Sequence, residues 1–212
     1  NLKDPEAYPA LGEAAAALQE QYRLGGNWLL FLATAPDLFP VVAHNLAWTA
    51  GGGFRRLLVE KPFGRDLDSA RAFNEGLRER FSEEEIYRID HYLGKEMLQN
   101  ILVLRFANRM FEPVWHRGHV DHIQISVRER SGVHQRGGYY DHAGALRDMI
   151  QNHVLQLLAL MAMERPERLD ADGIRKEKVR VLRALRPFRS DRIETEAVLA
   201  QYGEGNGRSG YR

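Results

Sequence analysis

The chain has 212 residues, which is enough for one large domain or two small ones. Hydrophobic residues make up 44% of it and charged residues 28%, as in an ordinary soluble globular protein, and a net charge of +1 gives no support to binding of nucleic acid or a membrane. Cysteine is absent, which excludes disulfides and thiolate metal sites and suits a reducing compartment, so we expect a cytoplasmic protein without a bound metal.

The two ends of the chain indicate a fragment. The chain begins at Asn1 rather than Met, shows no signal peptide, and has no apolar run near the ~20 residues of a membrane-spanning helix. Residues 203–212 are rich in glycine and stop without a terminal element. We therefore expect both ends to be cuts through a longer protein.

Residues 1–90 predict an alternation of helices and buried strands. Apolar stripes at helical spacing alternate with short continuous apolar runs, which are typical of strands buried on both faces in a parallel sheet. The expected helices are 7–24, 39–49 and 68–81, and the expected strands are 28–33, 54–60 and 85–89. Ser82 and Glu85 have the spacing of a capping box, but a strand follows, so we expect no capped turn there. The order of elements indicates a doubly wound α/β domain.

The pattern changes after residue 90. Residues 119–130 alternate between apolar and polar side chains, which predicts a strand with one exposed face in a largely antiparallel sheet. The other expected elements are helices at 97–109, at 142–163 and from a cap at Asp172 to about 185, and a strand at 194–202. We therefore expect two domains, an α/β dinucleotide-binding domain at 1–90 and an α+β domain at 91–212.

A polar cluster lies where the strand at 85–89 gives way to the helix at 97–109. It reads R-I-D-H-Y-L-G-K-E over residues 88–96. Backbone N–H groups at a helix N-terminus favour an anion, and His91 and Lys95, four residues apart, would share a face of the first helical turns. The cluster predicts a phosphate site, although a turn with merely solvated charges fits this stretch equally well.

Two further stretches carry chemistry. Lys61 follows a buried strand in E-K-P-F-G, at the sheet edge where ligands bind in open α/β folds, although residue types alone favour a simple turn. His153 stands in the apolar stripe of the helix at 142–163, where a core histidine bonded to a backbone carbonyl is the usual finding. Asp148 lies five residues before it, about 140° around an α-helix, so we do not expect these two on one face.

These stretches together resemble the signatures of the glucose-6-phosphate dehydrogenase family. The matching segments are E-K-P-F-G at 60–64, R-I-D-H-Y-L-G-K-E at 88–96, R-F-A-N at 105–108, and R-G-G-Y-Y-D at 136–141 continuing to R-D at 147–148 and Q-N-H at 151–153. The similarity covers residues 7–212. The family's Gly-rich dinucleotide fingerprint is missing, because the glycines at 51–53 precede a strand instead of following one. We expect that fingerprint, and most of the sheet of the second domain, to lie outside the chain.

The resemblance implies oxidation of D-glucose 6-phosphate at C1 to the 6-phosphoglucono lactone, with NADP as hydride acceptor. It implies that His153 is the general base and Asp90 its orienting acid. It places His91, Tyr92 and Lys95 on the phosphate and Glu129 and Asp148 on sugar hydroxyls. It also implies that Lys61 bridges the sugar and the nicotinamide, and that Pro62, joined to it by a cis bond, lies beside the cofactor. The implied partners are glucose 6-phosphate and further copies of the protein, without nucleic acid or membrane.

Three alternatives stay open: a related hexose dehydrogenase with another sugar or cofactor preference, a non-catalytic relative kept for assembly, and a phosphate-binding regulatory module. The presence together of Asp90, Lys95 and His153 favours the enzyme. NADP and NAD are not distinguished, because the discriminating loop lies in the missing fingerprint region.

Overall fold

The computed structural model describes residues 1–34, 38–46, 53–128, 132–133, 136–200 and 203–204. It divides into two compact units, Asn1–Asp90 and His91–Arg212, each with its own cluster of buried hydrophobic side chains. We refer to them as the N-terminal unit and the C-terminal unit.

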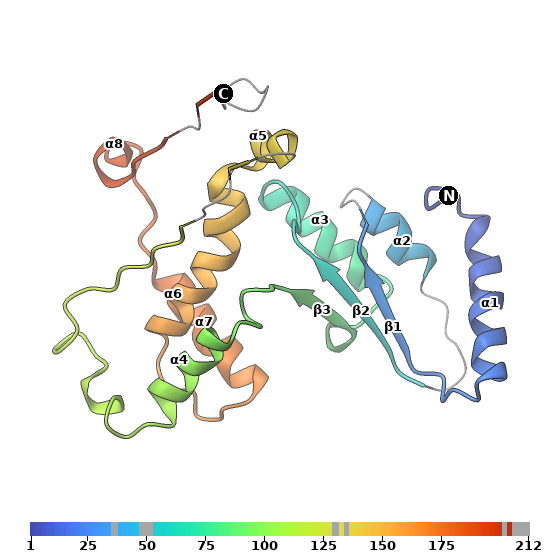
Figure 1. The fold of residues 1–212 in the computed structure, drawn as a ribbon, viewed down its shortest axis with the longest axis horizontal. Helices are drawn as coiled ribbons and strands as arrows, with labels where there is room; N and C mark the ends of the chain where they lie inside the picture. The colour runs from blue at the N-terminus through green and yellow to red at the C-terminus, as the bar shows by residue number, and fades with distance from the viewer. Residues whose placement is uncertain (35–37, 47–52, 129–131, 134–135, 201–202, 205–212) are drawn as a thin grey trace. The chain divides into compact units, whose positions relative to one another are not determined.

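The N-terminal unit is built on a parallel sheet, as the continuous apolar runs predict. Its strands are β1 (Trp28–Leu32), β2 (Arg55–Glu60) and β3 (Ile86–Ile89), in the order β1-β2-β3 (Figure 1). The helices are α1 (Ala7–Gln21), α2 (Phe39–Asn45) and α3 (Leu67–Arg78). The register pairs Leu30 with Leu57, and Leu57 with Ile86, so inward-pointing side chains line up across the strands.

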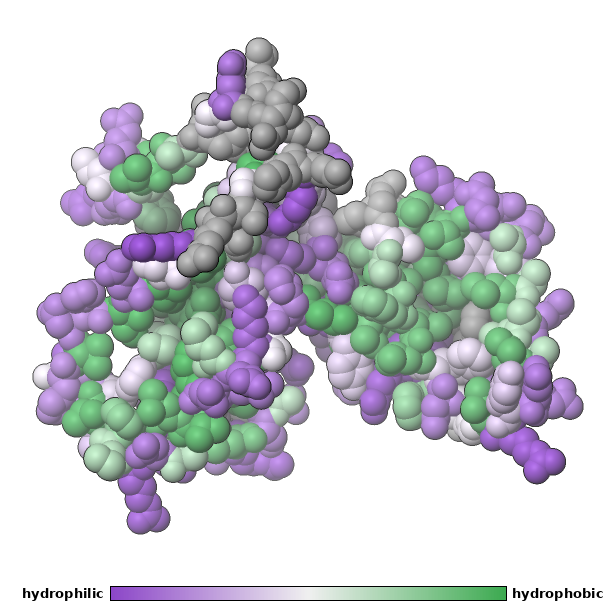
Figure 2. Space-filling view, viewed as in Figure 1, coloured by the Kyte–Doolittle hydropathy of each residue, from purple (hydrophilic) through white to green (hydrophobic). Residues whose placement is uncertain are grey.

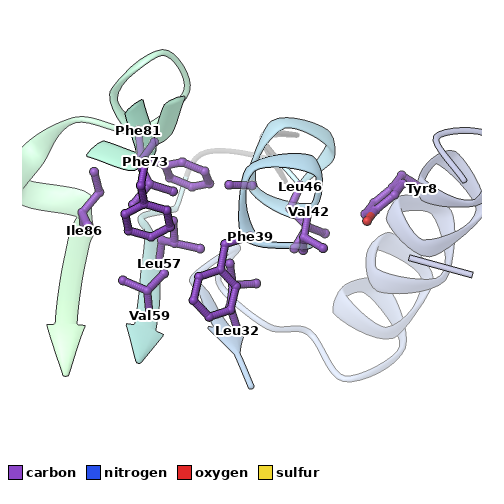
Figure 3. Close-up of a cluster of buried hydrophobic side chains, with 12 residues drawn as sticks. Tyr8, Leu32, Phe39, Val42, Leu46, Leu57, Val59, Phe73, Phe81 and Ile86 are labelled. Carbon is purple, nitrogen blue, oxygen red and sulfur yellow. The ribbon is translucent and has the colours of Figure 1, made fainter. Parts of the chain in front are cut away.

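The helices of this unit cover one face of the sheet. Figure 3 shows Leu57, Val59 and Ile86 of the strands on the side of the sheet that faces Phe39 of α2 and Phe73 of α3. The rings of Phe39 and Phe73 lie 5.8 Å apart, and all five side chains are buried. The apolar core of the unit therefore lies between the sheet and α2 and α3.

The opposite face of the sheet is exposed, contrary to the expectation of strands buried on both faces. Side chains of a strand alternate between faces, so the residues between the inward ones point away from the helices. Phe31, Leu58 and Tyr87 form a row across this face, and Phe31 and Tyr87 are 52% and 44% exposed. Figure 2 shows hydrophobic side chains at the surface over the strands. A second layer is needed to bury this face, and the described residues of the unit do not supply one.

A capping box that the sequence analysis discounted is formed. The Ser82 backbone N–H donates to Glu85 Oε2 at 2.8 Å, and the pair encloses a one-turn 3-10 helix, η2 (Glu83–Glu85). The prediction was wrong because one 3-10 turn is short enough to end before β3 begins.

The C-terminal unit is helical in its described residues, and no described helix in the chain is both long and apolar enough to cross a membrane. Its elements are α4 (Glu96–Phe106), η3 (Glu112–Val114), α5 (Gly137–Ala145), the π-helix η5 (Leu146–Val154), α6 (Leu155–Ala162), α7 (Ala171–Ala184) and α8 (Ile193–Glu196). Its buried hydrophobic cluster is Tyr92, Leu98, Phe106, Leu157, Leu160 and Met163.

The two strands expected in this unit are not formed by its described residues. Residues 119–128 are irregular, and the stretch expected to begin a strand at 194 is instead the short helix α8. A strand is held by hydrogen bonds to a neighbouring strand, and the described part of the unit contains none. The antiparallel sheet therefore stays a prediction for a longer protein.

The long helix expected at 142–163 is divided, and it begins earlier. Helix starts at Gly137, and Gly144 interrupts it with a φ of 62° and a ψ of 176°, a conformation that suits glycine. Helix α7 is capped by Asp170 and not by the predicted Asp172. The Asp170 side chain accepts a hydrogen bond from the Gly173 N–H at 2.9 Å.

Candidate functional site

The candidate site of the C-terminal unit centres on a stack of two rings. Tyr92 and His153 lie face to face, with ring centroids 4.1 Å apart and planes inclined by 13°. The His91 ring meets the His153 ring edge-on, with centroids 4.6 Å apart at 84°. The Lys95 ammonium lies 3.5 Å from the centre of the Tyr92 ring. Four residues predicted from the sequence are thus brought together, with the fully buried His153 innermost.

His91 and Lys95 lie near each other because of a turn, and not because they share a helix face as predicted. Helix α4 begins at Glu96 with Lys95 as its N-cap, and residues 91–94 form a turn. The expectation that both cations share a helix face was therefore wrong. They converge because Tyr92 lies between them, with its ring centroid 5.1 Å from that of His91. Both side chains are exposed beside the N-terminus of α4, an arrangement that suits an anion.

Asp148 is a buried carboxylate held by two donors. Arg136 Nη2 donates to it at 3.1 Å and the Tyr139 hydroxyl donates at 3.3 Å, while only 2% of Asp148 is exposed. Burial and the neighbouring Asp148 carboxylate raise the pKa of Tyr139, so this hydroxyl keeps its proton. The charge of Asp148 is thus compensated inside the unit by Arg136.

The π-helix overturns the argument that separated Asp148 from His153. An α-helix has 3.6 residues per turn. Segment η5 is instead a π-helix, in which each turn is wider and hydrogen bonds join residues five apart. Residues five apart therefore lie on nearly the same face. In agreement, both Asp148 and His153 are buried. The wider turn places these two positions closer together around the helix axis than an α-helix would.

Arg105 anchors the helix that continues from η5, a role that the sequence analysis missed. Its guanidinium is buried and donates to the carbonyl oxygens of Leu160 at 2.6 Å and Met163 at 2.7 Å. Trp115 Nε1 donates to the carbonyl of Met161 at 2.9 Å. These donors satisfy carbonyls that a helix C-terminus leaves without an intrahelical partner. An arginine at apolar spacing, seven residues after Leu98, was the signal that could have identified it.

The remaining predicted residues lie elsewhere. Lys61 and Asp90 belong to the N-terminal unit and directly follow β2 and β3, whose last residues pair in register, so both stand at the carboxyl edge of the sheet. Both are partly buried, and the Lys61–Pro62 bond is cis, as the family resemblance implies. Glu129 lies outside the described residues. The pairing of Asp90 with His153 stays a prediction.

Comparison with known proteins gives consistent matches along the chain. A family model described as the NAD binding domain of glucose-6-phosphate dehydrogenase matches residues 1–100, and one described as its C-terminal domain matches residues 102–212. The glucose-6-phosphate 1-dehydrogenase of Bacillus subtilis is 48% identical over 97% of this chain and 42% of its own length. That of Rhizobium meliloti is 54% identical over 85% of this chain and 37% of its own length.

Two solved structures that are similar to this chain are also glucose-6-phosphate dehydrogenases. A glucose-6-phosphate dehydrogenase in complex with its substrate glucose-6-phosphate is 39% identical, with a TM-score of 0.82 over 90% of this chain and 40% of that chain. The Mycobacterium avium glucose-6-phosphate 1-dehydrogenase is also 39% identical, with a TM-score of 0.74 over 87% of this chain and 39% of that chain. The chain thus spans less than half the length of the relatives that it matches.

Proposed function

The chain belongs to the glucose-6-phosphate dehydrogenase family, and from this premise we propose that it is part of an enzyme that oxidises D-glucose 6-phosphate. The reaction converts C1 to the carbonyl of 6-phospho-D-glucono-1,5-lactone, with NADP as hydride acceptor, as the first step of the oxidative pentose phosphate pathway. The observation that carries the proposal is the convergence of His91, Tyr92 and Lys95 around the buried imidazole of His153.

His153 is the general base of the proposed reaction and takes the proton of the C1 hydroxyl. An imidazole suits this step near neutral pH, since its unperturbed pKa is about 6.5. His153 is fully buried, with its imidazole against the rings of Tyr92 and His91. Asp90 is its proposed orienting acid, which would stabilise the imidazolium that forms, as the acid of a hydrolase triad does.

The substrate is held at both of its ends. The exposed side chains of His91 and Lys95, beside the N-terminus of α4, bind the 6-phosphate together with the Tyr92 hydroxyl. Asp148 and Glu129 accept hydrogen bonds from sugar hydroxyls. Binding at the remote phosphate orients C1 toward the base, and this orientation is the main use of the phosphate site in catalysis.

The N-terminal unit fits one part of the cofactor. Lys61, at the carboxyl edge of a parallel sheet, stands where dinucleotides bind in open α/β folds, and we assign Lys61 and Pro62 to the nicotinamide side. When bound, the cofactor accepts the hydride that leaves C1. The described residues include no Gly-rich turn between a strand and a helix, so the pyrophosphate site belongs to the rest of the protein. The family model for a NAD binding domain supports a nicotinamide dinucleotide, and family membership favours NADP.

We also propose the domain organisation of the longer protein. Residues 1–90 form the C-terminal half of its dinucleotide-binding domain, and residues 91–212 form the N-terminal part of an α+β domain whose largely antiparallel sheet is completed elsewhere. The complete protein is proposed to be a homo-oligomer that binds neither nucleic acid nor membrane.

Substitution of His153 tests the proposal. In the complete enzyme, His153→Asn should lower kcat by about 10²- to 10⁴-fold, the usual contribution of a general base, and leave binding of glucose 6-phosphate nearly unchanged. His122→Asn, at a histidine whose side chain is 74% exposed, is the matched control and should keep full activity. A His153→Asn enzyme with near-normal kcat would return His153 to the role of a core histidine.

A further inference from the structure

We infer that the aromatic ring of Tyr92, as distinct from its hydroxyl, positions the imidazole of His153 for proton abstraction. This inference rests on the proposed role of His153 as general base. It gives Tyr92 two separable parts: a hydroxyl that binds the substrate phosphate and a ring that orients the base.

The neighbouring rings restrict rotation of the His153 imidazole about the bond that carries it. Rotation about the bond that carries an imidazole ring is broad and roughly two-fold, so the ring plane must be set by its neighbours. The Tyr92 ring lies 4.1 Å from His153 at 13°, and the His91 ring stands against it at 84°. Rotation of the imidazole out of the stacking plane would drive its atoms into the Tyr92 ring. A base must direct its lone pair at the proton that it abstracts, so this plane matters for the reaction.

The Tyr92 ring is itself held from its second face. The imidazole occupies one face, and a Lys95 ammonium 3.5 Å from the ring centre can fit only on the other. A cation over the face of an aromatic ring is attracted by the ring quadrupole. Tyr92 is also buried in the cluster that contains Leu98 and Leu157. The ring is therefore a fixed wall rather than a mobile side chain.

The stack joins two elements with different functions. Tyr92 lies in the turn before α4, with the phosphate-binding cations, whereas His153 lies on η5. The stack therefore joins the turn that carries the phosphate-binding residues to the segment that carries the proposed base.

Two substitutions in the complete enzyme separate the ring from the hydroxyl. Tyr92→Phe keeps the ring and removes the hydroxyl, so KM for glucose 6-phosphate should rise while kcat stays within about threefold of wild type, since the base keeps its orientation. Tyr92→Leu removes the ring as well and should lower kcat by a further 30- to 100-fold or so, the cost of a misplaced catalytic group. Tyr22→Leu, at an exposed tyrosine directly after α1, is the matched control.

The kinetic outcomes are distinct. Equal kcat values for Tyr92→Phe and Tyr92→Leu would overturn the inference and leave the proposed function intact. A normal kcat for His153→Asn would overturn the proposed function, and the inference with it.

A spectroscopic measurement decides the case if Tyr92→Leu fails to fold. In enzyme labelled with ¹³C-histidine, the ring protons of His153, assigned by their loss in His153→Asn, should be shifted upfield by the Tyr92 ring current. The shift should be present in wild type and in Tyr92→Phe. Ring-proton shifts at the values of free histidine in both proteins would overturn the inference.

Discussion

At the scale of single residues, the site depends on three side chains that are close in sequence and differ in their surroundings. Tyr92 is buried against His153, whereas His91 and Lys95 are exposed to solvent. A buried aromatic ring suits the positioning of a base, and exposed cations suit capture of an anion from water. The turn at residues 91–94 produces this division, since it directs neighbouring side chains to different environments.

The exposed cation Lys95 gives a prediction about substrate choice. In the complete enzyme, Lys95→Ala should remove a charge-assisted hydrogen bond worth about 1.5–3 kcal/mol, which is a rise of about 10- to 100-fold in KM for glucose 6-phosphate. Any activity on unphosphorylated glucose should be nearly unchanged, because that sugar has no phosphate to lose. Steady-state kinetics on both sugars measure the difference.

A matched control exists on α7, where Lys176→Ala removes the same charge from an exposed position and should leave both activities unaltered. An equal loss on both sugars in Lys95→Ala would mean that Lys95 serves the chemistry or the fold.

At the scale of elements, His153, the proposed base, lies in a helical segment that follows Gly144 and is held at its C-terminal end. Gly144 interrupts the helix before η5. Arg105 and Trp115 donate hydrogen bonds to the last carbonyls of α6. Since η5 and α6 are continuous, these contacts restrict the position of His153 along the helix axis and its rotation about that axis within the unit.

Arg105 gives a prediction about stability. Arg105→Met would leave two buried carbonyls without their donor, which should cost about 1–3 kcal/mol in the free energy of unfolding. The midpoint of thermal unfolding of the complete protein should fall. Arg183→Met, the same substitution at an exposed position on α7, should not change it. Equal midpoints for the two variants would show that Arg105 does not hold the end of α6.

At the scale of the whole molecule, the chain presents surfaces that are suited to burial. One face of the parallel sheet exposes Leu29, Phe31 and Tyr87, and both β1 and β3 are edge strands among the described residues. Unpaired strand edges and large apolar faces favour association with other chains. The relatives are more than twice as long as the part that this chain matches.

This surface predicts the behaviour of the isolated chain. The 212 residues alone should be poorly soluble, should not bind NADP measurably, and should not oxidise glucose 6-phosphate, although Asp90, Lys95 and His153 are all present. The reason is that, in the proposed domain organisation, the pyrophosphate site and the second layer of the sheet belong to the rest of the protein. Calorimetric titration of NADP into the purified chain measures this, with the complete protein as control. Micromolar binding by a monodisperse chain would mean that the cofactor site has been misplaced.

Patterns in the sequence predict the helices and strands of the N-terminal unit and their parallel arrangement, whereas the residues that gather around His153 are implied by the family resemblance. Helical stripes and continuous apolar runs are local patterns, so they can be read before the chain folds. The cis bond at Lys61–Pro62 was also foreseen, from the family resemblance. The strands expected at 119–130 and 194–202 are not formed by the described residues. A strand depends on a neighbouring strand, which can be distant in sequence.

The assembly of the site depends on packing between elements that lie far apart in the sequence. The apolar spacing of residues 142–163 predicts an α-helix, whereas η5 is a π-helix, so the angle between Asp148 and His153 around the helix was overestimated. The stacking of Tyr92 on His153 joins residues far apart in sequence and could not be read from either segment. A one-dimensional pattern gives the chemical types of the site residues, whereas their mutual orientation depends on packing between elements.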